Sequence, residues 1–329
     1  MLWVSGRPDG HRVREITAPD GERIPLREWH RPDPRAVILY LHGQGDHSGP
    51  FAAMGDCLYD MGFSLYAHDH RGFGLSRARR GHIDSYDQYL DDVATVINHA
   101  QSQYPGKPCF LLGLSMGGHL ALRAAYRNGH QLAGVIALSP GLKLRRMPPL
   151  RAVVLAVLYA LFDPDRYLPA IAEKVITTRN QTHLERAQQD ERWVTTFTAR
   201  FYVETIRSVA RAWREAKRIQ IPVLILQAGA DELVCADTSR RFSQRIGHPD
   251  VEYRLLEGLA HNLVAEPEMP EIARTISDWI DRHLEAGKAR SGVQAGLLEA
   301  SPAASFAQRP AVGLPLATEA APSERTLQG

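Results

Sequence analysis

Short apolar runs alternate with longer amphipathic stretches along the first third of the chain. Residues 36–41, 63–67 and 109–114 each form an apolar run with the length of a buried strand. Between these runs, residues 51–61 and a stretch that ends near residue 104 have the spacing of amphipathic helices. Strands that alternate with helices in this way predict a parallel sheet with helices on both faces.

The same pattern returns further along the chain. Residues 132–138, 223–227 and 251–256 are again apolar runs of strand length. Near the start, residues 12–30 are predicted as two short strands around the turn Pro19-Asp20-Gly21. The pattern as a whole predicts the α/β fold class, with one mostly parallel sheet.

The alternation stops in one internal segment and again at the end of the chain. Residues 142–218 have a mostly helical pattern, which predicts an inserted helical cap between two sheet strands. The α/β core would then consist of residues 1–141 and 219–285. Residues 286–329 contain 11 Ala and 4 Pro with little periodicity, so we expect a disordered tail without a catalytic part.

The segment Cys109–Gly118 joins a predicted strand to a predicted helix through the sequence Gly-Leu-Ser-Met-Gly. G-x-S-x-G in this setting is typical of a nucleophile elbow, a sharp turn that exposes a serine hydroxyl. Gly113 and Gly117 flank Ser115, and we expect side chains at the two glycines to clash as the turn closes. An ordinary glycine-rich turn is the alternative, but the strand before it and the helix after it favour catalysis.

A serine hydroxyl is a poor nucleophile at neutral pH, so it needs a base and a group that orients the base. Asp231 and His261 each follow a predicted strand near its carboxyl end. The order serine, acid, histidine is the one that this fold uses. The sequence therefore predicts a catalytic triad of Ser115, Asp231 and His261, with Glu232 as the alternative acid.

Acyl transfer also needs hydrogen-bond donors for the developing oxyanion. One donor should be the backbone N–H of Met116, the residue after the nucleophile. The other should come from the loop after an early strand, and His42-Gly43-Gln44-Gly45 follows the strand at residues 36–41. By position, the backbone N–H of Gln44 is the second predicted donor.

Five longer motifs accompany these single residues. The motifs are His42-Gly43-Gln44-Gly45-Asp46-His47-Ser48, Ala67-His68-Asp69-His70-Arg71-Gly72-Phe73-Gly74-Leu75-Ser76, the elbow, Gln227-Ala228-Gly229-Ala230-Asp231 and Glu257-Gly258-Leu259-Ala260-His261. With them the chain resembles the monoglyceride lipase and lysophospholipase branch of the α/β-hydrolases, which are hydrolases of the serine aminopeptidase S33 type. The resemblance covers roughly residues 12–285. It implies the α/β-hydrolase fold, with an eight-stranded, mostly parallel sheet and a helical cap. It also implies cofactor-free hydrolysis of a single-chain acyl lipid, either a monoacylglycerol or a lysophospholipid.

Two positions depart from the family pattern. The family usually has His before the nucleophile, where this chain has Leu114, and it favours Glu where this chain has Asp46. Neither change removes a catalytic group. A peptidase or thioesterase of the same fold, or a non-catalytic ligand-binding protein of that fold, remains an alternative. A dehalogenase is disfavoured because it needs an aspartate in place of Ser115.

Composition adds limits on partners and compartment. The 329 residues are 44% hydrophobic, which is ordinary for a globular protein, and carry a formal net charge of +2. This charge gives no reason to expect a nucleic-acid partner. Three widely spaced cysteines fit a reducing compartment. Because residues 1–15 lack the apolar core of a signal peptide and no apolar run reaches about 18 residues, we expect a cytoplasmic protein.

The predicted cap contains an unbroken apolar segment at residues 152–162, which is too short to span a bilayer. One interpretation is a helix buried against the cap and core. The other is a wall of the acyl-binding tunnel that also touches membrane. Residues 143–218 contain 15 Lys and Arg against 8 Asp and Glu. This basic excess belongs either to solvated helix faces or to a surface that attracts anionic lipid. The second interpretation predicts peripheral contact with an anionic membrane through the cap.

His68, Asp69 and His70 look at first like metal ligands. Successive side chains at the end of a strand alternate between its two sides, so the three cannot easily face one ion. We therefore expect no metal site in this protein.

Overall fold

The computed structural model describes residues 11–170 and 176–299, and within them its description of side chains ends at Glu285. The chain divides into two units, residues 1–285 and residues 286–329. The sheet and the candidate site belong to the first unit.

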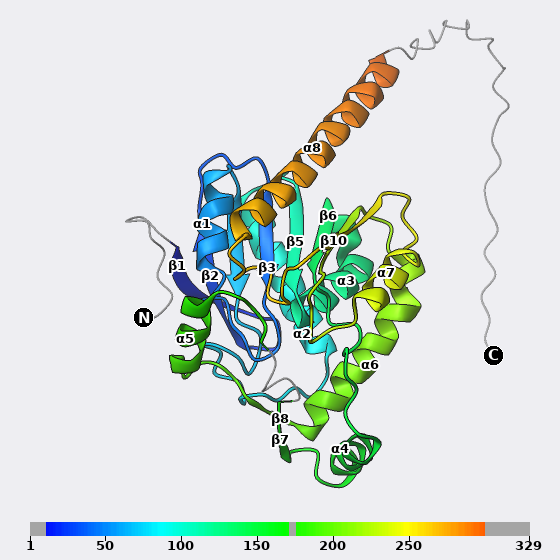
Figure 1. The fold of residues 1–329 in the computed structure, drawn as a ribbon. Coiled ribbons are helices and arrows are strands. Elements are labelled where there is room, and N and C mark those ends of the chain that lie inside the picture. The colour runs from blue at the N-terminus through cyan, green and yellow to red at the C-terminus, as the bar shows by residue number, and fades with distance from the viewer. Residues whose placement is uncertain (1–10, 171–175, 300–329) are drawn as a thin grey trace, which may run out of the picture. The chain divides into compact units, whose positions relative to one another are not determined.

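A single eight-stranded sheet forms the centre of this unit (Figure 1). Its strands are β1 (Arg12–Thr17), β2 (Arg23–Trp29), β3 (Val37–Leu41), β4 (Ser64–His68), β5 (Cys109–Leu114), β6 (Gly134–Leu138), β9 (Val223–Ala228) and β10 (Val251–Leu256). They lie in the order β1-β2-β4-β3-β5-β6-β9-β10. The pairs β1·β2 and β2·β4 are antiparallel and the remaining pairs are parallel. The predicted mostly parallel sheet is confirmed.

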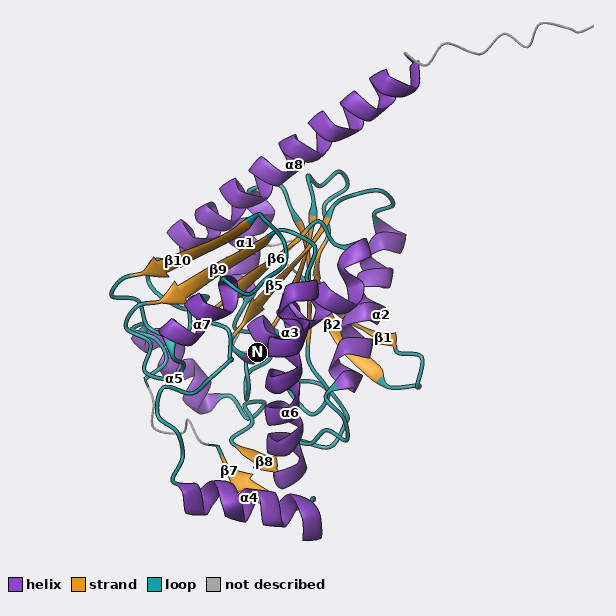
Figure 2. Cartoon of the chain, turned by 90° about the vertical axis from the view of Figure 1, so that its right-hand side faces the viewer, coloured by secondary structure: helices purple, strands orange, loops and turns teal. Residues whose placement is uncertain are grey.

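Helices pack against both faces of the sheet (Figure 2). They are α1 (Ala52–Asp60), α2 (Asp87–Gln103), α3 (Met116–Asn128) with the short η1 (Gly129–Gln131), α7 (Ala236–Ser243) and α8 (Met269–Glu299). Along β3, Leu39 and Leu41 pack in the cluster that contains α2 and α3, whereas Ile38 and Tyr40 pack in the cluster that contains α1 and α8. Burial on both faces explains why the central strands have continuous apolar runs.

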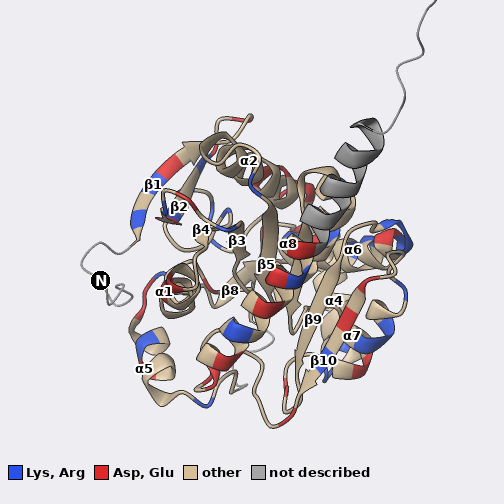
Figure 3. Cartoon of the chain, turned by 90° about the horizontal axis from the view of Figure 1, so that it is seen from above, with Lys and Arg blue, Asp and Glu red and all other residues tan. Residues whose placement is uncertain are grey.

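The edge strand β1 differs from the central strands in charge. Figure 3 shows charged residues along β1, whereas β3, β5 and β9 carry none. Most β1 side chains are exposed. Charged side chains on an edge strand oppose pairing with another chain, so β1 ends the sheet.

The insertion between β6 and β9 contains both helices and strands. Its elements are α4 (Leu150–Phe162), β7 (Tyr167–Pro169), α5 (Gln181–Gln189), β8 (Thr196–Thr198), α6 (Ala199–Glu215) and η2 (Ala216–Arg218). The antiparallel pair β7·β8 was not predicted, because strands of three residues leave too little sequence for an alternating pattern.

Helix α4 contradicts the interpretation of residues 152–162 as a buried helix. None of its residues is buried, and Phe162 is 84% exposed. The large exposed apolar residues on and next to α4 are Met147, Leu150, Val154, Leu155, Val157, Leu158, Leu161 and Phe162. The helix packs mainly against α6, which leaves most of its surface uncovered.

Helix α8 differs from the prediction for the end of the chain. It continues to Glu299, so residues 286–299 are helical where we expected a disordered tail. This stretch contains strong helix formers such as Ala, Leu and Arg and no proline, which the composition of the whole tail obscured. The remainder of the predicted tail, residues 300–329, lies outside the described residues.

Candidate active site

Ser115 lies at a sharp turn between β5 and α3. Its φ of 55° and ψ of −113° fall in a region that residues other than glycine rarely adopt. A Cβ at Gly113 would lie 2.2 Å from the Gly117 carbonyl oxygen, and a Cβ at Gly117 would lie 2.0 Å from that of Leu41. The predicted need for glycine on both sides of Ser115 is therefore confirmed.

Asp231 and His261 are hydrogen-bonded to each other. His261 Nδ1 lies 2.7 Å from Asp231 Oδ2, and both side chains are buried. The other carboxylate oxygen accepts the backbone N–H groups of Leu233 and Val234 at 2.8 and 2.9 Å. Burial alone would raise the pKa of Asp231, but these hydrogen bonds outweigh it and hold the pKa below its ordinary value. The carboxylate is therefore charged and fixed toward the imidazole.

The second ring nitrogen of His261 faces no partner in the part of the chain that the structure describes. Because the carboxylate accepts at Nδ1, the proton lies there and Nε2 is an acceptor. Nε2 is buried and has no hydrogen-bond partner among the described residues. No hydrogen bond joins it to Ser115 in that part of the chain, as is common in hydrolases without substrate. An imidazole held in this way can receive a proton.

The three residues share one edge of the sheet. Ser115 directly follows β5, and Asp231 and His261 follow β9 and β10, which run parallel to it. The carboxyl ends of parallel strands meet at one edge, which is where open α/β sheets bind ligands. The alternative acid, Glu232, is exposed and has no hydrogen bond to His261 among the described residues.

Two polar residues that the sequence analysis did not single out contact Asp231. The Gln227 side-chain amide donates to Asp231 Oδ2 at 3.1 Å, and Arg145 Nη1 donates to the Asp231 carbonyl at 2.6 Å. Gln227 begins the motif that ends at Asp231, so its place four residues before the aspartate could have indicated this contact. Arg145 comes from the insertion, and nothing in the sequence indicates its contact.

The loop after β3 passes directly against the serine. A Cβ at Gly43 would lie 3.5 Å from Ser115 Cβ. Among the described residues, the backbone N–H groups of Gln44 and Met116 donate to no protein acceptor. Unpaired N–H groups beside a serine can receive an oxyanion.

Two buried histidines hold the first part of this loop. His42 Nδ1 donates to the Gly43 carbonyl at 2.8 Å, and His42 Nε2 accepts the backbone N–H of His70 at 2.9 Å. Burial lowers the pKa of His42 to about 3, so the ring stays neutral. A protonated ring would present an N–H to the N–H of His70 and break this link.

The insertion holds the second part of the loop. The Gly45 carbonyl accepts the backbone N–H of Val194 at 2.8 Å, and His47 Nε2 donates to Asp190 at 3.0 Å. Both Val194 and Asp190 belong to the insertion. The loop that carries Gln44 is thus fixed from the sheet and from the insertion.

The His68-Asp69-His70 segment does not converge on one point. His68 and His70 are hydrogen-bonded to each other at 3.0 Å, whereas Asp69 accepts the backbone N–H groups of Ser48 and Leu75. The alternation expected at the end of a strand is present. The described residues contain no group of three or more potential ligands that could hold a metal ion.

Within the described ranges, no helix combines the length and the apolar character that crossing a lipid bilayer requires.

Comparisons with known proteins give consistent results. The family described as "Serine aminopeptidase, S33" matches residues 32–268. The chain is 30% identical to monoglyceride lipase of Homo sapiens over 280 residues, and this match covers 83% of this chain and 90% of that protein. It is 28% identical to a phospholipase of Bacillus subtilis over 262 residues, and this match covers 78% of this chain and 99% of that protein. The structure of monoacylglycerol lipase from Paleococcus ferrophilus, 27% identical, matches with a TM-score of 0.71 over 83% of this chain and 99% of that one.

Proposed function

Because this chain belongs to the serine aminopeptidase S33 family of α/β-hydrolases, we propose that it hydrolyses carboxylic esters of lipids with one acyl chain through Ser115. One observation carries the assignment of residues. A serine in a strained turn at the end of β5 shares a sheet edge with the hydrogen-bonded pair of Asp231 and His261. His261 Nε2 has no hydrogen-bond partner among the described residues. This arrangement has the parts that acyl transfer needs.

The proposed reaction has two steps. First, Ser115 Oγ attacks the ester carbonyl while His261 Nε2 takes the hydroxyl proton and then gives it to the leaving alcohol. The N–H groups of Gln44 and Met116 bind the oxyanion that forms. In the second step, water gives a proton to His261 and attacks the acyl-serine, which releases the fatty acid and restores Ser115. Asp231 keeps the imidazole in the required tautomer and stabilises its positive charge.

The substrate class is supported by the relatives. Two of them are named a monoglyceride lipase and a phospholipase, and each is matched over at least nine-tenths of its length. Both names denote enzymes that act on acyl lipids. We therefore propose a monoacylglycerol or lysophospholipid as substrate of this chain.

The experiment combines covalent labelling with a substrate panel. We expect a fluorophosphonate to label Ser115, and Ser115→Ala to abolish both labelling and hydrolysis of a monoacylglycerol. Ser139→Ala is the matched control, because Ser139 also has a positive φ but is fully buried. The Ser139→Ala variant should still be labelled at Ser115. Full labelling of Ser115→Ala would contradict the assignment. Preferential cleavage of a peptide amide or a thioester in the panel would favour the corresponding alternative of the same fold.

We also propose that α4 makes peripheral contact with an anionic membrane. The apolar side chains on α4 are exposed, and Arg146 and Arg151 are exposed beside them. A helix that combines an apolar surface with basic residues is suited to lie at a lipid interface. An enzyme that takes lipid substrates would gain from docking there. Arg145 is left out of this surface because it donates to the Asp231 carbonyl.

A further inference from the structure

A buried carboxylate belongs to the loop that carries His261, between β10 and α8. The Glu266 side chain is fully buried, and its Oε2 accepts the backbone N–H of Ala260 at 3.0 Å. Ala260 directly precedes His261 in the chain. A single hydrogen bond thus joins this carboxylate to the residue that precedes the proposed base.

The same carboxylate binds a segment of the insertion. Glu266 Oε1 accepts the Thr178 hydroxyl at 2.8 Å and the backbone N–H of Arg179 at 2.7 Å. The Arg179 guanidinium donates to Oε2 at 2.8 Å. Oε1 therefore accepts from the insertion alone, whereas Oε2 accepts from both the histidine loop and the insertion.

A second set of contacts joins the same two segments. The backbone N–H of Asn262 donates to the Thr177 carbonyl at 2.6 Å, and the Thr178 hydroxyl also lies 3.1 Å from the Ala265 carbonyl. On either side of His261, Ala260 is thus bonded to Glu266 of the same loop and Asn262 is bonded to the insertion. The histidine loop has no regular secondary structure of its own, so these contacts define its position.

The charge of Glu266 is maintained by its donors. Burial would raise the pKa of this carboxyl, but the hydrogen bonds from Ala260, Arg179 and Thr178 hold the pKa below its ordinary value. A buried, ionised carboxylate with this many donors is strongly held, and hydrogen bonds to a charged group are stronger than neutral ones. It fixes the distance between the insertion and the histidine loop.

We propose that Glu266 is a positioning residue, which fixes His261 for proton transfer by clamping its loop to the Thr178–Arg179 segment of the insertion. The proposal rests on the function proposed above. Glu266 touches neither substrate nor reacting atoms, and it acts only through the backbone at Ala260. A displacement of about 1 Å at a reacting group can cost about 100-fold in rate, so loss of the clamp should reduce turnover strongly.

The test compares two glutamates that both bind Arg179. Glu266→Gln keeps the size of the side chain but replaces one acceptor oxygen by an NH2 group. Depending on which way the amide lies, either the Ala260 N–H or the Arg179 backbone N–H then faces a donor and loses its acceptor. Glu268→Gln removes only the exposed ion pair with Arg179 and is the matched control. The measurements are kcat and KM on a short soluble ester, together with the rate of Ser115 labelling by a fluorophosphonate.

We expect Glu266→Gln to lower kcat and the labelling rate together, by about 10- to 100-fold, with KM within about twofold of the wild type. Glu268→Gln should match the wild type. If Glu266→Gln has a lowered melting temperature but wild-type kcat, Glu266 serves stability alone and the proposal is wrong. Failure of the wild-type protein to be labelled at Ser115 would instead overturn the proposed function, and this inference with it.

A second variant covers the case in which Glu266→Gln does not fold. Arg179→Gln removes the half-exposed cation from the clamp but leaves Glu266 bonded to Ala260. We expect a several-fold loss of kcat in this variant, again with unchanged KM. An unchanged kcat in Arg179→Gln, with Glu266→Gln unfolded, would also contradict the proposal.

Discussion

At the scale of single residues, the candidate site depends on groups whose hydrogen bonds are almost completely used. Both Asp231 oxygens accept hydrogen bonds, from His261 and Gln227 at one and from Leu233 and Val234 at the other. The neighbouring His261 Nε2 and the N–H groups proposed for the oxyanion have no protein partner within the described residues. Fixed partners on one side and free groups on the other are what a preorganised site requires.

The first prediction distinguishes Asp231 from Glu232. Asp231→Asn would place an amide N–H near His261 Nδ1, which favours the wrong tautomer and removes the charge partner of the imidazolium. We expect kcat on a soluble ester to fall by about 10⁴-fold, as in other triads, and Glu232→Gln to stay within about twofold of the wild type. The opposite pattern would transfer the orienting role to Glu232.

The second prediction concerns Asp46, where the family favours Glu. Burial, with the Asp69 and Asp190 carboxylates nearby, raises the pKa of Asp46 to about 8 in the folded state. The unfolded chain releases this proton near pH 4, so between about pH 4 and pH 8 it binds fewer protons than the folded chain. The stability that the protonated carboxyl contributes is therefore complete at acidic pH and is lost as the pH rises.

Asp46→Asn should remove this dependence because the amide is neutral at every pH and keeps an acceptor for the His47 N–H. We expect the free energy of unfolding of the variant, relative to the wild type, to increase from pH 5 to pH 8. Urea denaturation at the two pH values measures the difference. A difference that does not change with pH would show that Asp46 is ionised in the folded protein.

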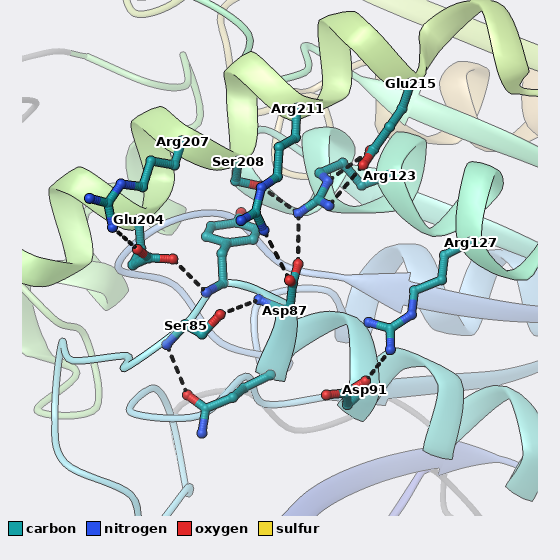
Figure 4. Close-up of polar contacts among 12 residues, drawn as sticks. Ser85, Asp87, Asp91, Arg123, Arg127, Glu204, Arg207, Ser208, Arg211 and Glu215 are labelled. Carbon is teal, nitrogen blue, oxygen red and sulfur yellow. Dashed lines mark hydrogen bonds and ion pairs between the residues drawn. The ribbon is translucent and has the colours of Figure 1, made fainter.

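At the scale of elements, charged side chains join α6 of the insertion to α2 and α3 of the core (Figure 4). Arg123 on α3 binds Glu215 of α6 through two nitrogens at 2.9 and 3.0 Å. It also binds Asp87 of α2 and Ser208 of α6, each at 3.2 Å. Because Arg123 is nearly buried, it connects three helices at one point.

The start of α2 contributes to the same region. The sequence predicts a capping box from Ser85 and Gln88. Gln88 Oε1 accepts the Ser85 backbone N–H at 3.2 Å, and Ser85 Oγ accepts the Asp87 N–H at 3.3 Å (Figure 4). The bond from the Ser85 N–H to Gln88 that a capping box requires is present, but Ser85 Oγ accepts from Asp87 and not from Gln88. Both contacts hold the end of α2 from which Asp87 reaches Arg123.

The third prediction compares two arginines of α3. Arg123→Met would leave Glu215 without its cation, whereas Asp87 keeps its ion pair with Arg211. Removing one partner of a nearly buried ion pair should cost about 3–5 kcal/mol. Arg127→Met removes an exposed pair with Asp91, which should cost less than about 1 kcal/mol. Chemical denaturation measures both. Equal losses would show that the buried network stabilises no more than a surface pair does.

The fourth prediction concerns α4. Changing Arg146 and Arg151 to Gln should reduce co-sedimentation with anionic vesicles at low salt, since each basic residue near such a surface contributes about 1 kcal/mol. High salt should weaken binding of the wild type. Changing Arg240 and Arg241 of α7 to Gln is the control and should leave binding unchanged. If the wild-type protein stays in the supernatant at low salt, the proposed membrane contact is wrong.

At the scale of the whole molecule, the described core ends well before the end of the chain. The buried apolar residues of α8 are Ile272, Ala273, Ile276, Trp279 and Ile280. They pack against the face of the sheet that α1 also covers. Every described core residue therefore precedes the second unit, residues 286–329.

The fifth prediction follows from that boundary. Deleting residues 290–329 should change neither the melting temperature nor turnover on a soluble ester, because the deletion removes none of the described core or site residues. Thermal unfolding and a kinetic assay of the truncated protein measure the two effects. A decrease of several degrees would show that this segment stabilises the first unit.

The sequence predicted the sheet well because buried strands have a local signature. The strand at residues 251–256 agrees with β10 at both ends, and the one at residues 36–41 agrees with β3 within one residue. The need for glycine at positions 113 and 117 could be predicted as well, since a turn this tight leaves no room for a Cβ. By contrast, β7·β8 was missed, and the sequence left open whether α4 is buried or exposed, because both depend on which neighbour covers a short segment.

The sequence by itself determined the class of the fold, its strands and the three residues proposed as a triad, since each is marked by a pattern or motif within a few neighbouring positions. Only the tertiary structure brought Arg145 to Asp231 and joined Glu266 of the histidine loop to the insertion. These contacts join residues 86 to 88 positions apart. No local pattern encodes them, because they form only when the chain has packed and burial leaves a charged group no other partner.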